Sequence, residues 1–296
     1  MIVIPERFVD STITREGEIG RKWIASLPNL VSALCKQWNL AVDGQPMHGY
    51  FGLVIPVIRT GGPYILKISW INEFTRDEAA ALSIWNGRSI VQLLEVQPQY
   101  GAMLLERLDN RRTLNDIEIT KAITIAAQIL RRLAIPDPGH FPYLKDMAAD
   151  IAASLYERWV RQAQPFSQHL LETACDLAAQ LGPSAGNLLV NYDIHYADVL
   201  AGSREPWLAV DPKPIIGDPE YGIAQLLWRR LEDIIAGSGL DYHFRLLVET
   251  AELDPQLAYG WTLVRCIDYW LWGLNIGLSE DPIRCEYLAN WLMEQQ

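Results

Sequence analysis

The local sequence pattern changes near residue 110, and this change limits the folds that the chain can adopt. Before that point, short apolar runs rich in β-branched and aromatic residues alternate with turn residues. The stretch 49–70 is an example, because RTGG separates two such runs and predicts a hairpin. After that point, most apolar residues recur every three or four positions, which is typical of amphipathic helices. The pattern therefore predicts an α+β chain with a small β-rich first part and a larger, mostly helical second part.

The first part also contains helical segments. Residues 18–40 carry apolar side chains at helical spacing, and Pro28 predicts that a second helix begins there. The Ala-rich segment 76–87 predicts a helix with Gly87 directly after its C-terminus. Pro56 indicates an edge strand or a bulge, because proline has no N–H to donate to a ladder. Two further strands are predicted at 90–96 and 100–108.

The helical second part is interrupted once. Residues 187–217 contain short strand-like runs broken by glycine and proline, and this island carries several aspartates. We expect helices on both sides of it, at 114–134, 144–162, 168–181, 221–236, 242–252, 257–273 and 282–295.

Composition excludes several classes of protein. Half of the 296 residues are hydrophobic, which supports a substantial core. The formal net charge of −11 argues against nucleic acid as a partner and suits a cationic substrate. No apolar run approaches the roughly 18 residues that span a bilayer, so we expect no membrane partner. The start of the chain has no signal-peptide pattern, and the four cysteines show no metal-ligand spacing, so we expect a cytoplasmic protein.

Several polar residues follow the order that phosphoryl transfer requires. Such a site needs glycines near the phosphates, a strand lysine held by a helix glutamate, a loop carboxylate for the acceptor hydroxyl and oxygen ligands for Mg²⁺. In chain order the candidates are Gly49, Gly52, Lys67, Glu78, Asp193, Asp198 and Asp211.

Each candidate also has a simpler interpretation. Lys67 fits a solvent-facing strand lysine, and Glu78 fits an acid favoured at a helix start. Glu73 competes with Glu78 as the partner of Lys67. The two glycines fit ordinary turns, and Asp211 fits a turn before Pro212. The order of the whole set favours the functional interpretation over these alternatives.

Longer motifs indicate a family. The segments HGYFGLVIPV, YILKISW, GAMLLERLD and, above all, DVLAGSREPWLAVDPKPIIGDPEYGIAQLLW are similar to those of the aminoglycoside/hydroxyurea phosphotransferase family. The chain resembles the streptomycin-kinase-like branch of that family, within the kinase-like superfamily, over almost its whole length.

The resemblance implies a protein-kinase-like two-lobe fold. Residues 1–108 would form the nucleotide-binding lobe with leading helices, and residues 109–296 would form a helical lobe with a catalytic hairpin and a substrate cleft. ATP and Mg²⁺ would be the cofactors, and Asp193 would be the catalytic residue. The metal would be held by Asp198 and Asp211, and the nucleotide by Gly49, Gly52, Lys67, Glu78 and backbone groups near Glu106 and Leu108.

The catalytic loop departs from the family pattern, His-Gly-Asp-Leu-His-x-x-Asn-Val-Leu. Asn191, Tyr192 and Asp198 stand where the family has histidine, glycine and asparagine, whereas Asp193 and His195 match. Asparagine can still brace the loop by hydrogen bonding, and a carboxylate remains a good Mg²⁺ ligand. Two hypotheses therefore stay open: an active small-molecule kinase, or a catalytically impaired relative that binds nucleotide or metabolite for sensing or partner binding.

The acceptor is implied only by the resemblance. It would be a hydroxyl-bearing small molecule of aminoglycoside or hydroxyurea type, and the sequence leaves the oligomeric state open. Candidate acids for a cationic acceptor are Glu232, Asp233, Asp241 and Asp268, each of which also fits a solvated helix charge. We expect a structural role for His195, a surface position for Lys213 and helix capping by Asp218. Most tryptophans should lie in the core, with Trp261, Trp270 and Trp272 as alternative cleft-wall residues.

Overall fold

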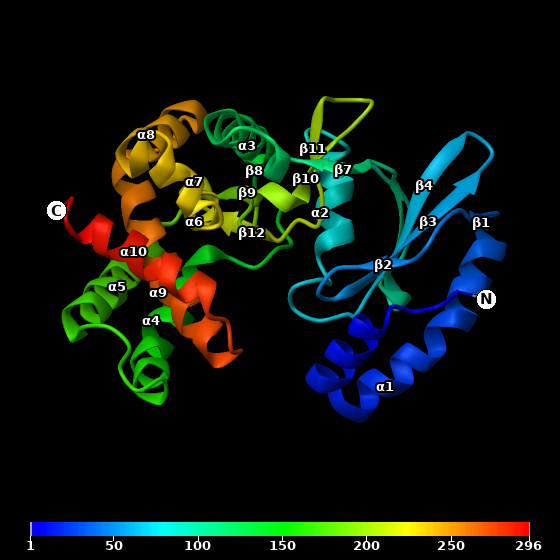
Figure 1. Ribbon diagram of the computed structural model, residues 1–296, viewed down its shortest axis with the longest axis horizontal. Helices are drawn as coiled ribbons and strands as arrows, with labels where there is room; N and C mark the ends of the chain where they lie inside the picture. The colour runs from blue at the N-terminus through cyan, green and yellow to red at the C-terminus, as the bar shows by residue number, and fades with distance from the viewer. Residues whose placement is uncertain (1, 296) are drawn as a thin grey trace. The chain divides into compact units, whose positions relative to one another are not determined.

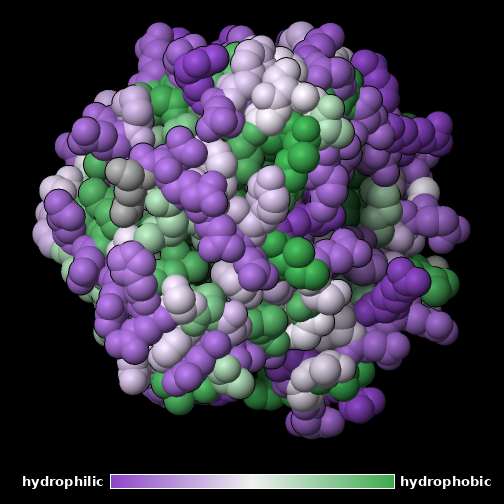
Figure 2. All heavy atoms as spheres, turned by 60° about the vertical axis from the view of Figure 1, so that its left-hand side comes forward, coloured by the Kyte–Doolittle hydropathy of each residue, from purple (hydrophilic) through white to green (hydrophobic). Residues whose placement is uncertain are grey.

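The computed structural model describes residues 2–295 (Figure 1). The chain forms two compact units, of which the first ends at Leu108 and the second begins at Asp109. No helix within residues 2–295 has both the length and the apolar character that crossing a bilayer requires. On the face drawn in Figure 2, hydrophilic residues are interspersed with smaller hydrophobic groups.

The first unit begins with a long helix, α1 (Glu6–Gln37), which is interrupted once. The interruption lies at Gly17, whose φ of 61° and ψ of −138° are not helical. Glycine adopts this conformation readily because it has no Cβ. The prediction that a second helix begins at Pro28 was therefore wrong: Pro28 lies inside the second half of α1.

A six-stranded antiparallel sheet follows, in the order β1-β3-β4-β6-β5, with β2 also paired to β3. Pro56 lies in β3, which is not an edge strand, so that expectation was wrong. Two very short strands pair with the outer side of β3, β2 opposite Leu53–Val54 and β1 opposite Val57–Ile58. Pro56 falls between them, where a missing N–H interrupts neither pairing. The elements are β1 (Ala41–Val42), β2 (Met47–His48), β3 (Gly52–Arg59), β4 (Gly62–Ser69), α2 (Glu78–Trp85), β5 (Leu93–Gln97), the 3₁₀ turn η1 (Pro98–Tyr100) and β6 (Ala102–Glu106).

The core of the first unit lies between α1 and the sheet. Leu27, Val31 and Leu34 of α1 are buried in one cluster with Ile55 of β3 and Leu66 of β4. Burial of each such side chain contributes about 1.5–3 kcal/mol relative to exposure. This packing fixes the sheet, and with it the position of Lys67 on β4.

The second unit consists mainly of helices. The predicted helix 221–236 is broken into η5 (Pro219–Gly222), α6 (Ala224–Trp228) and α7 (Leu231–Ala236), so that prediction was wrong in its continuity. A Cβ at Gly222 would lie 2.9 Å from the Asn191 carbonyl oxygen, so the chain passes too close to the catalytic loop for a larger residue. The other helices are η2 (Leu114–Asp116), α3 (Ile119–Leu133), α4 (Leu144–Arg161), α5 (Gln168–Leu181), η3 (Gly182–Ser184), α8 (Gly239–Ala251), α9 (Pro255–Asn275) and α10 (Glu280–Met293).

The strand-like segment 187–217 takes part in two small sheets. One has the order β11-β10-β7 and the other β12-β9-β8. The predicted catalytic loop lies between β9 and β10, and its short 3₁₀ turn is η4 (Tyr196–Asp198). The strands are β7 (Asp109–Thr113), β8 (Ile135–Pro136), β9 (Leu188–Asn191), β10 (Val199–Ala201), β11 (Trp207–Ala209) and β12 (Pro214–Gly217).

Candidate functional site

Lys67 and Glu78 form a buried ion pair in the first unit. The Lys67 ammonium on β4 lies 2.6 Å from Glu78 Oε1 and 2.8 Å from Oε2 at the start of α2. The Glu78 side chain is 1% exposed and that of Lys67 is 11% exposed. Glu73, the competing partner, is exposed at the surface. A lysine fixed in this way presents a directed positive charge, as a phosphate-binding lysine requires.

The two glycines lie at the turn into β3. The Gly49 N–H donates to the Gly52 carbonyl, at 2.9 Å, and Gly52 pairs with Ser69. A Cβ at Gly52 would lie 3.0 Å from Ser69 Oγ and 3.3 Å from Lys67 Cε, whereas one at Gly49 would meet no atom within 4 Å. A Cβ at Gly52 would therefore crowd two side chains, whereas Gly49 has open space beside it.

Glu106 and Leu108 lie at the end of the first unit. Glu106 is the last residue of β6, and its N–H donates to the Gln92 carbonyl while its carboxylate accepts from the Gln92 N–H. Leu108, half-buried, follows the strand. Their proposed part in nucleotide binding concerns backbone groups and stays a prediction.

Asn191 braces the catalytic loop of the second unit. Its Oδ1 accepts hydrogen bonds from the Asp193 N–H, at 3.2 Å, and from the Lys213 N–H, at 2.9 Å. One buried side chain thus joins the loop after β9 to the segment that carries Asp211. The hydrogen-bonding role inferred for asparagine at this position matches these contacts.

Tyr192 fits the loop without backbone strain. It is not among the described non-glycine residues with positive φ, so replacing the family's glycine costs no left-handed conformation here. The centre of its ring lies 5.9 Å from the centre of the Tyr221 ring. Burial, with the Asp193 charge next in importance, raises the pKa of Tyr192, so its hydroxyl stays neutral at physiological pH.

The Asp193 carboxylate is held by two side chains from helices that lie far along the chain. Gln225 Nε2 on α6 donates to Asp193 Oδ1, and Arg265 Nη2 on α9 lies 3.4 Å from the same oxygen. The Asp193 side chain is 29% exposed, so it remains accessible. An ionised carboxylate in this setting can accept a further hydrogen bond from a hydroxyl.

Arg265 is buried against two neighbouring aromatic rings. Its guanidinium lies 5.3 Å from the centre of the Tyr192 ring and 4.9 Å from that of Tyr221. Burial by itself lowers the pKa of Arg265, but Tyr221 and Asp193 outweigh it and the pKa is raised. Arg265 is therefore a permanent cation beside Asp193.

A backbone hydrogen bond joins the segments that carry Asp198 and Asp211. The Val210 N–H donates to the Asp198 carbonyl, at 2.8 Å, which places Asp211 one residue beyond this contact. Asp198 Oδ2 lies 2.9 Å from His195 Nε2, and Asp211 Oδ1 lies 3.1 Å from Lys213 Nζ. Burial lowers the pKa of His195, but Asp198 outweighs this effect, so the pKa is raised overall. Lys213 is buried, not at the surface as predicted.

As carboxylates, these two side chains are chemically suitable Mg²⁺ ligands, and their role in binding the ion stays a prediction. Within residues 2–295, no group of three or more His, Cys, Asp or Glu side chains is arranged to hold a metal ion. Mg²⁺ does not need one, because it is commonly bound by one or two carboxylates together with phosphate oxygens and water. The Asp211 carboxylate is paired with the Lys213 ammonium, 3.1 Å away.

The comparisons with known proteins now identify the family. The family model described as aminoglycoside/hydroxyurea antibiotic resistance kinase matches residues 37–277. The chain belongs to this family. Streptomycin 6-kinase of Streptomyces glaucescens is 36% identical to it over 290 residues, covering 95% of this chain and 94% of that protein. Hydroxyurea phosphotransferase of Kitasatospora aureofaciens is 35% identical over 298 residues, covering 99% of this chain and 86% of that protein.

The fold is that of protein-kinase-like enzymes. A thermostable mutant of aminoglycoside phosphotransferase APH(4)-Ia, in a ternary complex with ADP and hygromycin B, matches with a TM-score of 0.60. Sequence identity is 16%, and the match covers 88% of this chain and 97% of that chain. The fold class expected from the sequence is thus confirmed, as is the family of kinases to which the chain was assigned.

The other residues singled out in the sequence contact groups elsewhere in the second unit. Asp218 does not cap a helix through its side chain; its carboxylate accepts from the Gly186 N–H and from Trp261 Nε1, so that prediction was wrong. Trp261 and Trp270 are buried in the core, whereas Trp272 is 39% exposed. The four candidate acids also have donors: Asp233 with Arg230, Glu232 with Arg284, Asp268 with Arg158, and Asp241 with Trp291 Nε1.

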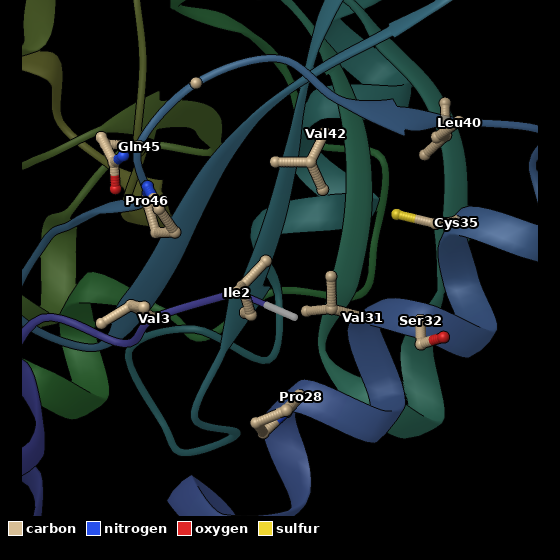
Figure 3. Close-up of a pocket in the computed structure, with 11 residues that line it drawn as sticks. Ile2, Val3, Pro28, Val31, Ser32, Cys35, Leu40, Val42, Gln45 and Pro46 are labelled. Carbon is tan, nitrogen blue, oxygen red and sulfur yellow. The ribbon is translucent and has the colours of Figure 1, made fainter.

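The first unit contains a cavity whose lining differs from that of a phosphate- or metal-binding site. It has a volume of about 450 Å³ and lies between the second half of α1 and the β1–β2 segment (Figure 3). Val31 and Cys35 of α1, Val42 of β1 and the loop residue Pro46 contribute to its lining, which contains no charged side chain. It lacks the groups that bind phosphate or metal, so we assign the kinase chemistry elsewhere.

Two residues of the site were not predicted. Arg265 is the single charged residue in WTLVRCI, a buried stretch of α9, and a lone charge among apolar residues is a recognisable signal of a functional or paired group. Gln225 gave no such signal, because glutamine is ordinary on a helix. Its contact with Asp193 joins residues 32 positions apart, which only the folded chain shows.

Proposed function

We propose that the protein is an ATP-dependent phosphotransferase that moves the γ-phosphate to a hydroxyl of a small molecule, either a cationic one of aminoglycoside type or one of hydroxyurea type. The observation that carries this proposal is the family match over residues 37–277, with streptomycin and hydroxyurea kinases among the relatives. The net charge of −11 supports a cationic acceptor, because a negative protein field attracts it.

Asp193 would act on the acceptor. Its carboxylate accepts a hydrogen bond from the acceptor hydroxyl and directs that oxygen at the γ-phosphorus. The bond from the γ-phosphorus to the β-γ bridging oxygen breaks as the new P–O bond forms, ADP leaves, and the hydroxyl proton passes to Asp193 late in the step. The partial exposure of Asp193 and the Arg265 guanidinium 3.4 Å from its Oδ1 support this role.

Each unit would contribute its own groups to nucleotide and metal binding. Lys67, fixed by Glu78, would bind phosphate oxygens, with the Gly49–Gly52 turn and backbone groups near Glu106 and Leu108 as further contacts. Asp198 and Asp211 would hold Mg²⁺. When bound, Mg²⁺ neutralises charge on the transferring phosphates.

The departures of the catalytic loop do not remove a required group. Asn191 makes the hydrogen bonds that brace the loop, Tyr192 brings no positive φ, and Asp198 keeps oxygen ligands. The impaired alternative therefore has no specific observation in its favour, and it becomes one outcome of the test.

The test is a transfer assay with the purified full chain. Radiolabelled ATP and Mg²⁺ are offered with streptomycin, with hydroxyurea and with a neutral polyol, and phosphorylated product is separated and counted. We expect transfer to at least one of the two drugs, loss of transfer in Asp193→Ala, and retained transfer in Asp150→Asn, an exposed position on α4. ATP binding by calorimetry without transfer to either drug would support the impaired alternative.

A further inference from the structure

The hydrogen bonds around Asp193 point to a role for two residues outside the catalytic loop. We propose that Gln225 and Arg265 are positioning residues that fix Asp193 Oδ1, so that Oδ2 is presented to the acceptor hydroxyl. The inference rests on the proposed function, because it assumes that Asp193 is the catalytic carboxylate. Both contacts converge on the same oxygen: Gln225 Nε2 donates to Oδ1, and Arg265 Nη2 lies 3.4 Å from it.

The orientation of the Gln225 amide follows from its two neighbours. Arg229 Nε donates to Gln225 Oε1, at 3.1 Å, and an arginine can only donate. An ionised aspartate can only accept. Gln225 must therefore turn its oxygen to Arg229 and its NH₂ to Asp193, and the reversed amide would face a donor with a donor and an acceptor with an acceptor.

Arg229 is itself held in place by α9 and α10. Its Nη1 lies 3.1 Å from Asp281 Oδ2, and its Nη2 donates to the Tyr269 hydroxyl, also at 3.1 Å. Tyr269 in turn donates to Asp281 Oδ2, at 3.1 Å. The amide that orients Asp193 thus depends on a fixed arginine.

Arg265 contacts the same Asp193 oxygen from α9. Its buried guanidinium packs against the neighbouring rings of Tyr192 and Tyr221, which limits its freedom to move. Tyr192 stands where the family pattern has glycine, so one of these two rings comes from a residue that departs from that pattern. In this chain the bulky residue next to Asp193 therefore packs on the cation that positions it.

Gln225→Glu is the decisive substitution. It keeps the shape of the side chain and the acceptor for Arg229, but it replaces the donor to Asp193 by a second carboxylate. We expect kcat for the drug accepted by the parent to fall by about 10- to 100-fold, since misplacement of a reacting group has effects of this size. KM for ATP should stay within about twofold, which separates positioning from substrate contact. Gln180→Glu, with the same charge change at an exposed site on α5, should match the parent.

The pH dependence tests whether the lost donor is the cause. A protonated carboxyl donates a hydrogen bond, so the ratio of variant to parent kcat should rise as pH falls. A purely structural defect would leave that ratio flat. The charged and titratable groups that face this position are Asp193, His195, Arg229, Arg265, Tyr269 and Asp281.

A second variant pair tests the contact without activity. Gln225→Glu sets two carboxylates against each other, and the double variant Gln225→Glu/Asp193→Asn removes that repulsion. We expect the double variant to melt at a higher temperature than Gln225→Glu alone. For Arg265, Arg265→Lys should retain more kcat than Arg265→Met, because lysine keeps the charge.

The outcomes separate the two proposals. A parent that transfers phosphate to neither drug overturns the proposed function, and the positioning role with it. An active parent with Gln225→Glu at parental kcat, or with a change in KM alone, overturns the positioning role and leaves the proposed function standing. A double variant no more stable than Gln225→Glu also counts against the contact.

Discussion

Glu78 holds both of its carboxylate oxygens within hydrogen-bond distance of the Lys67 ammonium, and its side chain is 1% exposed. The two residues are eleven positions apart, on β4 and at the start of α2. An ion pair with this burial is stable only while both charges are present, because desolvation of a single charge is costly.

Loss of Glu78 should destabilise the protein strongly. Glu78→Ala leaves the Lys67 charge without this carboxylate, and we expect a cost of about 3–5 kcal/mol in the free energy of unfolding. Glu78→Gln keeps an acceptor oxygen, and we expect about 1–3 kcal/mol. Urea denaturation followed by tryptophan fluorescence measures both. Exposed Glu73→Ala is the control and should change stability by about 0.5 kcal/mol or less. Equal stability of Glu78→Ala and Glu73→Ala would contradict the pairing.

The two glycines should respond differently to alanine. Gly52→Ala places a Cβ 3.3 Å from Lys67 Cε, so we expect about 1–3 kcal/mol of destabilisation from crowding. Gly49→Ala meets open space and should leave the melting temperature unchanged. If the Gly49 backbone approaches phosphate, its methyl should still weaken ATP binding by about tenfold, or ~1.4 kcal/mol. Calorimetric titration of each variant with ATP decides this, and unchanged affinity in Gly49→Ala would remove that residue from the nucleotide site.

Asp198→Asn restores the residue of the family pattern and tests the metal assignment. It removes one negative charge, and cation affinity follows the charge of the ligands. We expect the Mg²⁺ concentration for half-maximal transfer to rise by roughly tenfold while transfer persists. Asp150→Asn is the matched exposed control. An unchanged Mg²⁺ requirement would show that Asp198 does not hold the ion.

Glu220 should reduce stability at neutral pH. Burial, partly opposed by hydrogen bonding to the Asp254 N–H, raises the pKa of this carboxyl. The folded state therefore binds the proton more tightly than the unfolded state, so stability falls as pH rises from about 4.3 through the raised pKa. Glu220→Gln keeps the acceptor without the charge.

The variant Glu220→Gln should melt about 1–3 °C higher than the parent at pH 7 and equal it below about pH 4. Thermal melts followed by circular dichroism at several pH values provide the test. A stability difference that does not change with pH would rule out the buried charge as its cause.

Much of the fold could be predicted from local pattern. The hairpin that carries Lys67, the helix that begins near Glu78 and the mostly helical second part were all recognisable, because side-chain period and turn residues are local properties. The ends of helices and the breaks between them were harder to predict from the sequence. α3 begins at Ile119 and not at 114, because Glu118 accepts hydrogen bonds from the first free N–H groups and residues 114–116 form a separate turn.

Errors occurred where a neighbour distant in sequence decides the outcome. Asp218 has the sequence of a capping residue, but Trp261 and Gly186 supply its donors. Lys213 beside a proline suggested a surface residue, but its ammonium is buried next to Asp211. The local sequence contains no information on these partners, since they come from segments more than 30 residues away or from the path of a turn.

The sequence by itself determined the fold class, the family and the order of Lys67, Glu78, Asp193, Asp198 and Asp211, because periodicity and motif spacing are carried by neighbouring residues. Only the tertiary structure decided which side chains hold Asp193. Gln225 and Arg265 lie on helices 32 and 72 residues from it, and their donors converge on one oxygen only when those helices pack against the loop. Hydrogen-bond direction depends on positions in space, and these follow from packing of the whole unit.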